Sequence, residues 1–123
     1  MNAGLRTSIA LCALAVAPAA LATPDAVASR EIDHLLAFVA ASDCRFVRSG
    51  TEAPGPEARD HLVRKLGVAR PLISTADQFI DYVATGSSMT GQPYKVRCGT
   101  RELTSREWLR AELERHRSAT KAK

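Results

Sequence analysis

Apolar residues recur at helical spacing in four segments of the chain, and each stripe predicts one amphipathic helix. The predicted helices span residues 29–41, 56–66, about 75–85 and about 105–117. The stripes are Ile32, Leu35, Leu36 and Val39; Ala58, Leu62 and Leu66; Phe79, Ile80, Val83 and Ala84; and Trp108, Leu109 and Leu113. We expect the four stripes to meet in one core, and His34, which is off the first stripe, to face solvent.

Polar residues, proline and glycine predict where these helices begin and end. Ser29 is expected to cap the first helix, and Thr104 or Ser105 the last. Pro56 suits the first position of the second helix. Gly67 is a candidate for the residue that ends it.

Short alternating segments between the helices predict strands. Residues 44–48 and 93–98 alternate apolar and charged side chains, and residues 101–103 are a candidate third strand. Residues 51–55 are rich in Pro and Gly and are expected to form a loop. The predicted fold is therefore α+β and mainly helical, with about four helices and a small antiparallel sheet of two or three strands.

The N-terminal segment has the pattern of a secretory signal peptide. Arg6 precedes an apolar run over residues 9–21, which ends in Ala20-Leu21-Ala22. The run is too short to cross ~30 Å of hydrocarbon, which needs ~20 helical residues. We therefore predict export with cleavage after Ala22, one globular domain over residues 23–117, and a basic frayed tail over residues 118–123.

Export places the cysteines in an oxidising compartment. Cys12 lies inside the predicted signal peptide and would be removed with it, which leaves Cys44 and Cys98. Two thiols in such a compartment usually pair, so we predict that one disulfide clips the fold and contributes ~4 kcal/mol to stability. A redox role is the alternative, but no C-x-x-C spacing is present. The cysteines and three histidines have no recognised metal-ligand spacing, so no metal or cofactor is expected.

Composition narrows the classes of partner. Apolar residues make up 46% of the chain and charged residues 24%, which is ordinary globular usage. Aromatic residues are only 5%, which argues against a stacking platform for nucleic acid, and export argues against DNA as well. The net charge is +4, and basic residues concentrate after residue 94. We favour the interpretation that this basic C-terminal helix has a solvated face. The alternative is that the helix contacts anionic lipid.

Three polar side chains could hold an anion. His61 and Lys65 are four residues apart on the second predicted helix, so they share a face. Arg48 ends the first predicted strand, and Ser87 and Ser88 occupy the loop after the third helix. We predict that these residues could line a polar pocket.

The same residues allow a remote hydrolase hypothesis. Ser87 or Ser88 would be the nucleophile, with His61 and either Asp60 or Asp81 as partners. Neither serine lies in a nucleophile elbow, and the hypothesis requires a histidine nitrogen within ~3.2 Å of a serine oxygen. No catalytic residue is therefore assigned.

Several short segments of the chain form a recognisable series. They are Phe46-Val47-Arg48-Ser49-Gly50; Ala58, His61-Leu62 and Lys65-Leu66; Ile73-Ser74-Thr75-Ala76 and Phe79-Ile80; Ser87-Ser88 and Thr90-Gly91; and Pro93-Tyr94-Lys95-Val96. Their order and spacing resemble one family of small exported bacterial proteins, the domain of unknown function DUF5329. The similarity covers about residues 29–117, although Ser49 stands where the family pattern leads us to expect Asn.

The resemblance implies a periplasmic protein of a Gram-negative bacterium and implies no activity. It marks six polar positions as binding candidates: Arg48, His61, Lys65, Ser87, Ser88 and Tyr94. Our first hypothesis is a non-enzymatic interaction or accessory module with an unknown envelope protein as partner. The alternative is a small anionic-ligand binder using Arg48, His61 and Lys65.

Overall fold

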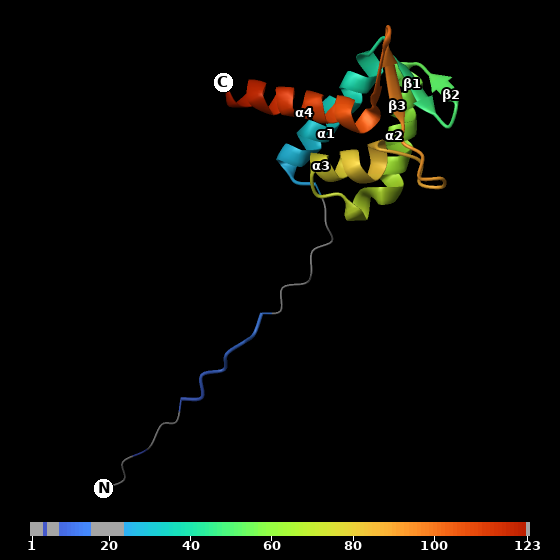
Figure 1. The fold of residues 1–123 in the computed structure, drawn as a ribbon. Helices are drawn as coiled ribbons and strands as arrows, with labels where there is room; N and C mark the ends of the chain where they lie inside the picture. Colours follow the sequence, from blue (N-terminus) through green and yellow to red (C-terminus); the bar gives the residue numbers. More distant parts are fainter. Residues whose placement is uncertain (1–3, 5–7, 16–23, 123) are drawn as a thin grey trace.

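Four helices and two β-hairpins follow one another after residue 25 (Figure 1). The structure is a computed structural model that describes residues 4, 8–15 and 24–122, so the predicted cleavage site at Ala20-Leu21-Ala22 lies outside the described residues. The elements are α1 (Ala26–Ala41), β1 (Arg45–Arg48), β2 (Thr51–Ala53), α2 (Gly55–Ala69), the 3₁₀ turn η1 (Arg70–Leu72), α3 (Ala76–Phe79), the π-helical turn η2 (Ile80–Ala84), β3 (Lys95–Cys98), β4 (Arg101–Thr104) and α4 (Ser105–Lys121).

The predicted fold class is confirmed, but the sheet has four strands rather than two or three. Its order is β2-β1-β3-β4, and every neighbouring pair is antiparallel. Residues 51–53 form strand β2, not a loop. Ser49 and Gly50 have φ of 48° and 80°, which are the positive values that a two-residue hairpin turn requires, so the chain folds straight back onto β1.

Three predicted helix boundaries are wrong. The side chain of Asp25 caps α1 by accepting a hydrogen bond from the Ala28 N–H at 2.8 Å, so α1 begins before Ser29. Helix α2 does not end at Gly67 but continues to Ala69, and the 3₁₀ turn η1 follows it directly. Helix α4 runs to Lys121 rather than Arg117. Its N-terminus is as predicted, since Thr104 caps it in a capping box.

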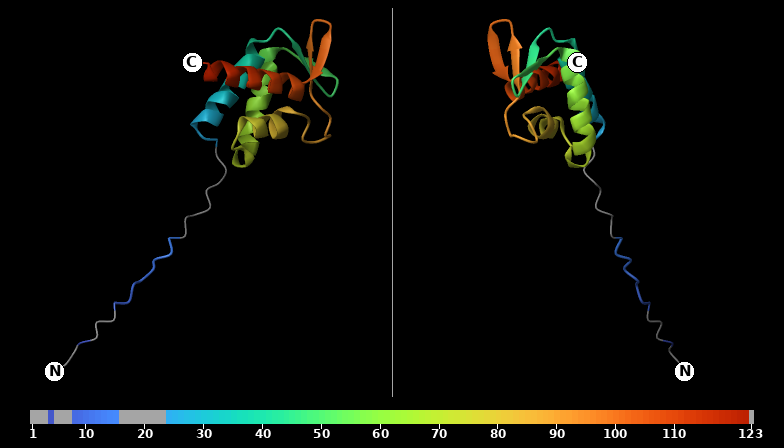
Figure 2. Two further views of the ribbon diagram at one scale, coloured as in Figure 1. Left: turned by 60° about the vertical axis from the view of Figure 1, so that its left-hand side comes forward. Right: turned by 90° about the vertical axis from the view of Figure 1, so that its right-hand side faces the viewer.

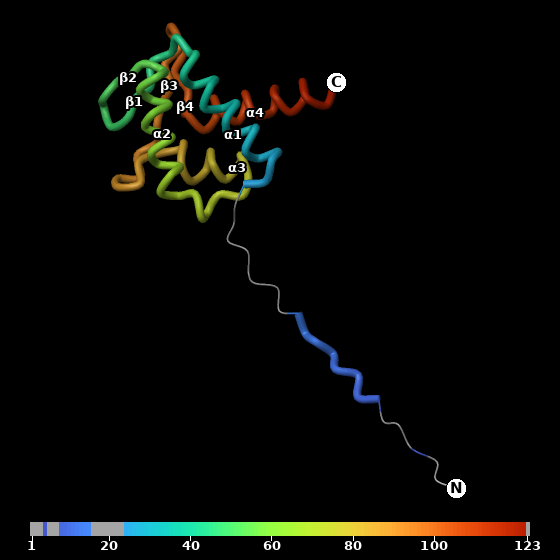
Figure 3. Tube along the Cα trace, turned by 180° about the vertical axis from the view of Figure 1, so that it is seen from behind, coloured from blue at the N-terminus to red at the C-terminus, as the bar shows by residue number. Residues whose placement is uncertain are grey.

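The core lies between the helices and one face of the sheet. All four predicted stripes contribute to it, and Tyr94 joins them. Phe46 of β1 packs edge-on against Trp108 of α4, with ring centroids 5.4 Å apart. Helices α1 and α2 lie side by side, and the C-terminal part of α4 extends away from the sheet (Figures 2 and 3).

Helix α4 is held to α1 and α3 by charged groups. Arg117 donates to Glu31 at 2.7 Å and to Asp77 at 2.9 Å, and the second of these bonds lowers the pKa of the Asp77 carboxyl. His34 is half-buried rather than solvent-facing, because α4 passes over it. Its Nε2 lies 2.8 Å from Oε1 of Glu112, and its ring stacks on His116 with centroids 3.9 Å apart.

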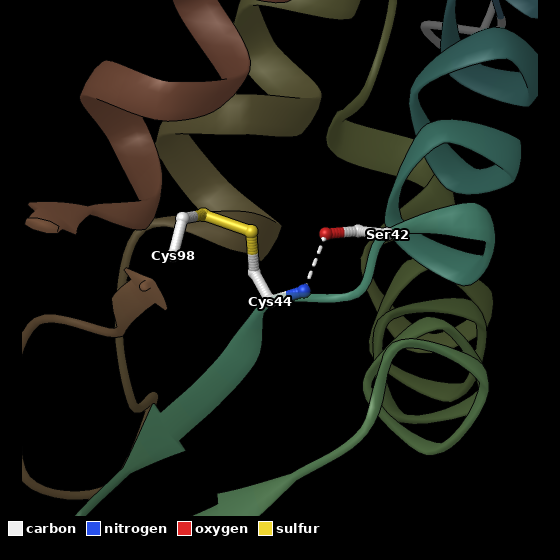
Figure 4. The surroundings of a disulfide bond; sticks show 3 residues. All are labelled: Ser42, Cys44 and Cys98. Carbon is white, nitrogen blue, oxygen red and sulfur yellow. Dashed lines mark hydrogen bonds between the residues drawn. A yellow bond between two sulfur atoms is a disulfide. The ribbon is translucent and has the colours of Figure 1, made fainter. Parts of the chain in front are cut away.

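The predicted disulfide is confirmed. Cys44, just before β1, is bonded to Cys98 at the end of β3, with Cα atoms 4.5 Å apart (Figure 4). The backbone N–H of Cys44 donates to the hydroxyl of Ser42 at 3.0 Å, which ties the cystine to the end of α1. Among the described residues, no helix is long and apolar enough to cross a membrane.

Candidate functional site

Helix α2 lies close to the end of α1, and a glycine makes this approach possible. A Cβ added at Gly55 would lie only 2.9 Å from the carbonyl oxygen of Ser42 and 3.0 Å from that of Ala40. Ordinary side chains do not tolerate such distances to backbone atoms. The glycine therefore fixes where α2 starts, and with it the position of the His61 and Lys65 side chains further along the helix.

The buried ring of Tyr94 forms the centre of the site. Its backbone is held on both sides, because its N–H donates to the Thr85 carbonyl and its own carbonyl accepts from the Ser105 N–H, each at 2.9 Å. Only 8% of the residue is exposed. The Nζ of Lys65 donates to the Tyr94 hydroxyl at 2.9 Å and to the Gly86 carbonyl at 2.7 Å. The hydroxyl also lies 3.1 Å from His61 Nε2.

Arg48 determines which way the His61 ring is protonated. It ends β1 and lies on the same face of the strand as Phe46. Its Nη1 is 2.6 Å from His61 Nδ1 and 3.0 Å from Nε2. A guanidinium can only donate, so a neutral His61 ring can accept from it through one nitrogen only. We assign that hydrogen bond to the shorter contact, which makes Nδ1 the acceptor and places the ring hydrogen on Nε2, 3.1 Å from the Tyr94 hydroxyl.

This assignment leaves one donor without an acceptor. A phenol oxygen has two lone pairs and one hydrogen. Lys65 and His61 Nε2–H use both lone pairs of Tyr94. No hydrogen bond from the Tyr94 hydroxyl to an acceptor is left within the part of the chain that the structure describes. The hydroxyl hydrogen is therefore available to a bound acceptor.

The charges around His61 are positive. Arg48, Arg64 and Lys65 have no carboxylate within 4.0 Å among residues 24–122, although eight other lysine and arginine side chains form such pairs. Burial, followed by the charges of Arg48, Lys65 and Arg64, lowers the pKa of His61 below its usual value. The ring is therefore neutral near pH 7, and the site presents donors with a net positive charge.

A pocket of about 80 Å³ opens beside these groups, between β1, β2 and α2. Its wall is mixed: apolar side chains from the sheet and α2 lie beneath the charged groups. Its lining residues include Phe46, Arg48, Ala53, Glu57, Ala58, His61, Leu62, Arg64, Tyr94 and Lys95. A more open hollow on the other side of His61 is lined by Arg64, Lys65, Val68, Tyr82 and Ser88.

The structure brings together four of the six predicted site residues: Arg48, His61, Lys65 and Tyr94. Ser88 lines the neighbouring hollow. The Ser87 hydroxyl accepts hydrogen bonds from the Met89 and Thr90 N–H groups, at 3.2 Å each, so it organises its own loop. Within the described chain, neither serine is hydrogen-bonded to a histidine, so the pairing that a hydrolase would need is not formed.

Sequence reasoning missed three charged residues at this pocket: Glu57, Arg64 and Lys95. Glu57 and Arg64 lie one turn before and one turn after His61 on α2. Their spacing of i−4 and i+3 from His61 could have indicated them, because such positions are neighbours on a helix surface. Helical spacing could not have indicated all of the apolar lining residues, since β1 and β2 contribute some of them through tertiary contacts.

The chain is similar to proteins without an assigned activity. The family described as "Family of unknown function (DUF5329)" matches residues 26–117. The "Uncharacterized protein YfeK" of Salmonella typhimurium strain LT2 is 43% identical over 86 residues, which are 69% of this chain and 72% of that protein. No solved structure matches the chain significantly.

Proposed function

This chain belongs to the DUF5329 family of unknown function, and we propose that it is an exported, non-enzymatic accessory protein that binds a small anion. The anion site consists of Arg48, His61, Lys65 and Tyr94. The observation that carries the proposal is the place of the Tyr94 hydroxyl, which accepts from Lys65 at 2.9 Å and lies 3.1 Å from Nε2 of His61. With the hydrogen of His61 on Nε2, both lone pairs of the hydroxyl are used and its own hydrogen is left for a bound acceptor. Around it stand three cations without a carboxylate partner in the described chain.

A carboxylate or another oxyanion fits this set of groups. It can accept from the Tyr94 hydroxyl and from the free N–H groups of Arg48, which line the pocket. Lys65 lines the neighbouring hollow, so it acts through its hydrogen bond to Tyr94 and through its charge. Each hydrogen bond to a charged group contributes about 1.5–3 kcal/mol, so two or three of them support a Kd on the order of 1 mM or below. The pocket is small, so the anion is a single group rather than a polyanion.

Export to the periplasm is part of the proposal. It is supported by the apolar run with its Ala20-Leu21-Ala22 ending and by the Cys44–Cys98 disulfide, since such bonds persist in oxidising compartments. An anion-binding protein in this compartment could act alone or present its bound anion to an envelope partner.

Arg48 offers the most direct test of the anion site. Arg48→Gln removes the charge and the guanidinium group but leaves α2 and Tyr94 in place, because Arg48 is exposed. We expect acetate and inorganic phosphate to release measurable heat in calorimetric titrations of the wild-type protein, and the Kd to rise about tenfold or more in the variant.

Arg101→Gln is the matched control. Arg101 is also an exposed strand arginine without an ion pair in the described chain, but it lies on β4, at the opposite edge of the sheet. Its replacement should leave the Kd unchanged. The proposal fails if the wild-type protein binds neither anion, or if both variants weaken binding equally, since the second result would report net charge rather than a site.

A further inference from the structure

We propose that the ligand of this pocket is a small aliphatic α-amino acid, with its carboxylate at Arg48 and Tyr94, its ammonium group at Glu57 and its side chain on the apolar floor. This inference rests on the proposed anion site and names its ligand class. Three features of the pocket carry it: the floor, the single carboxylate at the rim, and the spacing between that carboxylate and the anion site.

The floor of the pocket is apolar and small. Phe46, Ala53, Ala58 and Leu62 line it, and Leu62 is buried against the core. The volume of about 80 Å³ is roughly half of the ~150 Å³ of an apolar cavity that holds benzene. An isopropyl group suits such a space better than an aromatic ring does. A simple inorganic anion would leave this floor uncovered.

Glu57 is the one carboxylate among the residues that line the pocket. Within the described residues it has no cation within 4.0 Å, although Arg64 is on the same helix. Its place in the first turn of α2 is favourable for the helix by itself. Towards a bound anion, however, Glu57 would be repulsive unless the same ligand also carried a positive charge.

The spacing of these groups matches a zwitterion. Glu57 and His61 are one helical turn apart, which corresponds to a rise of about 6 Å along α2. The ammonium and carboxylate groups of an α-amino acid are separated by one carbon atom. With one hydrogen bond at each end, such a molecule reaches from Glu57 to the donors around His61. The side chain on the same carbon atom is then free to face the floor.

Calorimetric titration with a matched set of small molecules tests this inference. L-valine carries all three groups, isovalerate lacks only the ammonium group, isobutylamine lacks only the carboxylate, and L-threonine replaces a methyl group of valine with a hydroxyl. We expect L-valine to bind about tenfold or more tightly than isovalerate and isobutylamine, since a charge-assisted hydrogen bond of about 1.5–3 kcal/mol corresponds to such a factor. L-threonine should also bind more weakly than L-valine, because its hydroxyl would lose its hydrogen bonds to water against the apolar floor. L-phenylalanine should bind more weakly than L-valine as well.

Glu57→Gln separates the role of the ammonium contact from that of the anion site. In this variant we expect the Kd of L-valine to rise to within about threefold of that of isovalerate, while isovalerate binds no more weakly than before. Glu114→Gln, at an exposed glutamate of α4, is the control and should change neither value. Thermal melts of each variant confirm that α2 is folded under the titration conditions.

Two results overturn the inference alone, and a third overturns the proposed function with it. If isovalerate binds the wild-type protein as tightly as L-valine, and Glu57→Gln alters neither, the ligand is not a zwitterion although the anion site stands. If acetate or phosphate binds while L-valine does not, the apolar floor has no part in recognition. If no carboxylate or phosphate binds at all, the proposed function fails together with the inference.

Discussion

At the scale of single residues, the most informative group is a tyrosine hydroxyl that two donors already occupy. Tyr94 is buried and fixed through its backbone, so its hydroxyl cannot turn away to find another partner. The residues around it were partly predictable. His61 and Lys65 share a helix face by their spacing, but the contact of Arg48 with His61 depends on how β1 crosses α2, which no local pattern contains.

His61 makes the stability of the unliganded protein depend on pH. Its pKa in the folded state is below the usual 6.5, because burial and the nearby cations disfavour the charged ring. The unfolded chain therefore takes up the proton more readily. This contribution to stability is present above pH 6.5 and is lost as the pH falls through 6.5 towards the folded-state pKa. As the pH falls through this window, we expect the free energy of unfolding to decrease less for His61→Gln than for the wild type.

Urea denaturation of both proteins between pH 8 and pH 5 measures the effect. His34 and His116 are present in both, so the difference between the two curves isolates His61. Parallel curves for the two proteins would contradict the assignment. A bound anion should reverse the dependence, because it stabilises the protonated ring; ligand affinity should therefore rise as the pH falls.

At the scale of elements, the apolar stripes predicted the helices well and the boundaries less well. Ser29 is a good capping residue, but Asp25 precedes three residues that also accept a helical conformation, so α1 starts earlier. Strand β2 was missed because three residues beside Pro54 carry no alternating pattern. Its existence depends on the positive φ angles of Ser49 and Gly50, which bring it against β1.

Two glycines of α2 should respond to alanine in opposite directions. A Cβ at Gly67 would meet nothing within 4 Å, so Gly67→Ala should stabilise the protein by up to ~1 kcal/mol through helix propensity. A Cβ at Gly55 would press against the backbone at the end of α1, so Gly55→Ala should cost about 1–3 kcal/mol. Urea denaturation of the two variants checks both signs. Equal effects would mean that α2 does not approach α1 this closely.

At the scale of the whole molecule, helices from both ends of the chain close one core. Leu35 of α1 and Leu109 of α4 are both fully buried, and Arg117 of α4 bonds to Glu31 of α1. The fold class was predictable from the order of the elements, and the disulfide was predictable because two cysteines remain after the predicted signal peptide. The contact of His34 with α4 was not predictable from the sequence, since the direction of α4 depends on tertiary packing.

The disulfide is expected to contribute strongly to global stability. It joins residues 54 positions apart, and the chain-entropy relation gives ~4 kcal/mol for such a loop. The double variant Cys44→Ser, Cys98→Ser should therefore melt about 15 °C or more below the oxidised wild type. Calorimetric scans of the oxidised, reduced and variant proteins measure this. Identical melting temperatures for all three would contradict the prediction, because the disulfide would then add no net stability to the folded protein.

The sheet consists of two hairpins that each close over two residues, joined along β1 and β3 by pairs roughly 50 positions apart. Each hairpin can form early and independently during folding, because little chain has to be brought together. The pairing of β1 with β3 cannot form early in the same way, because α2 and α3 must first bring these two strands close together. The pocket lies between the first hairpin and α2, beside Tyr94 at the start of the second. It is therefore a late product of assembly, and a chain that has folded only locally has no binding site to offer.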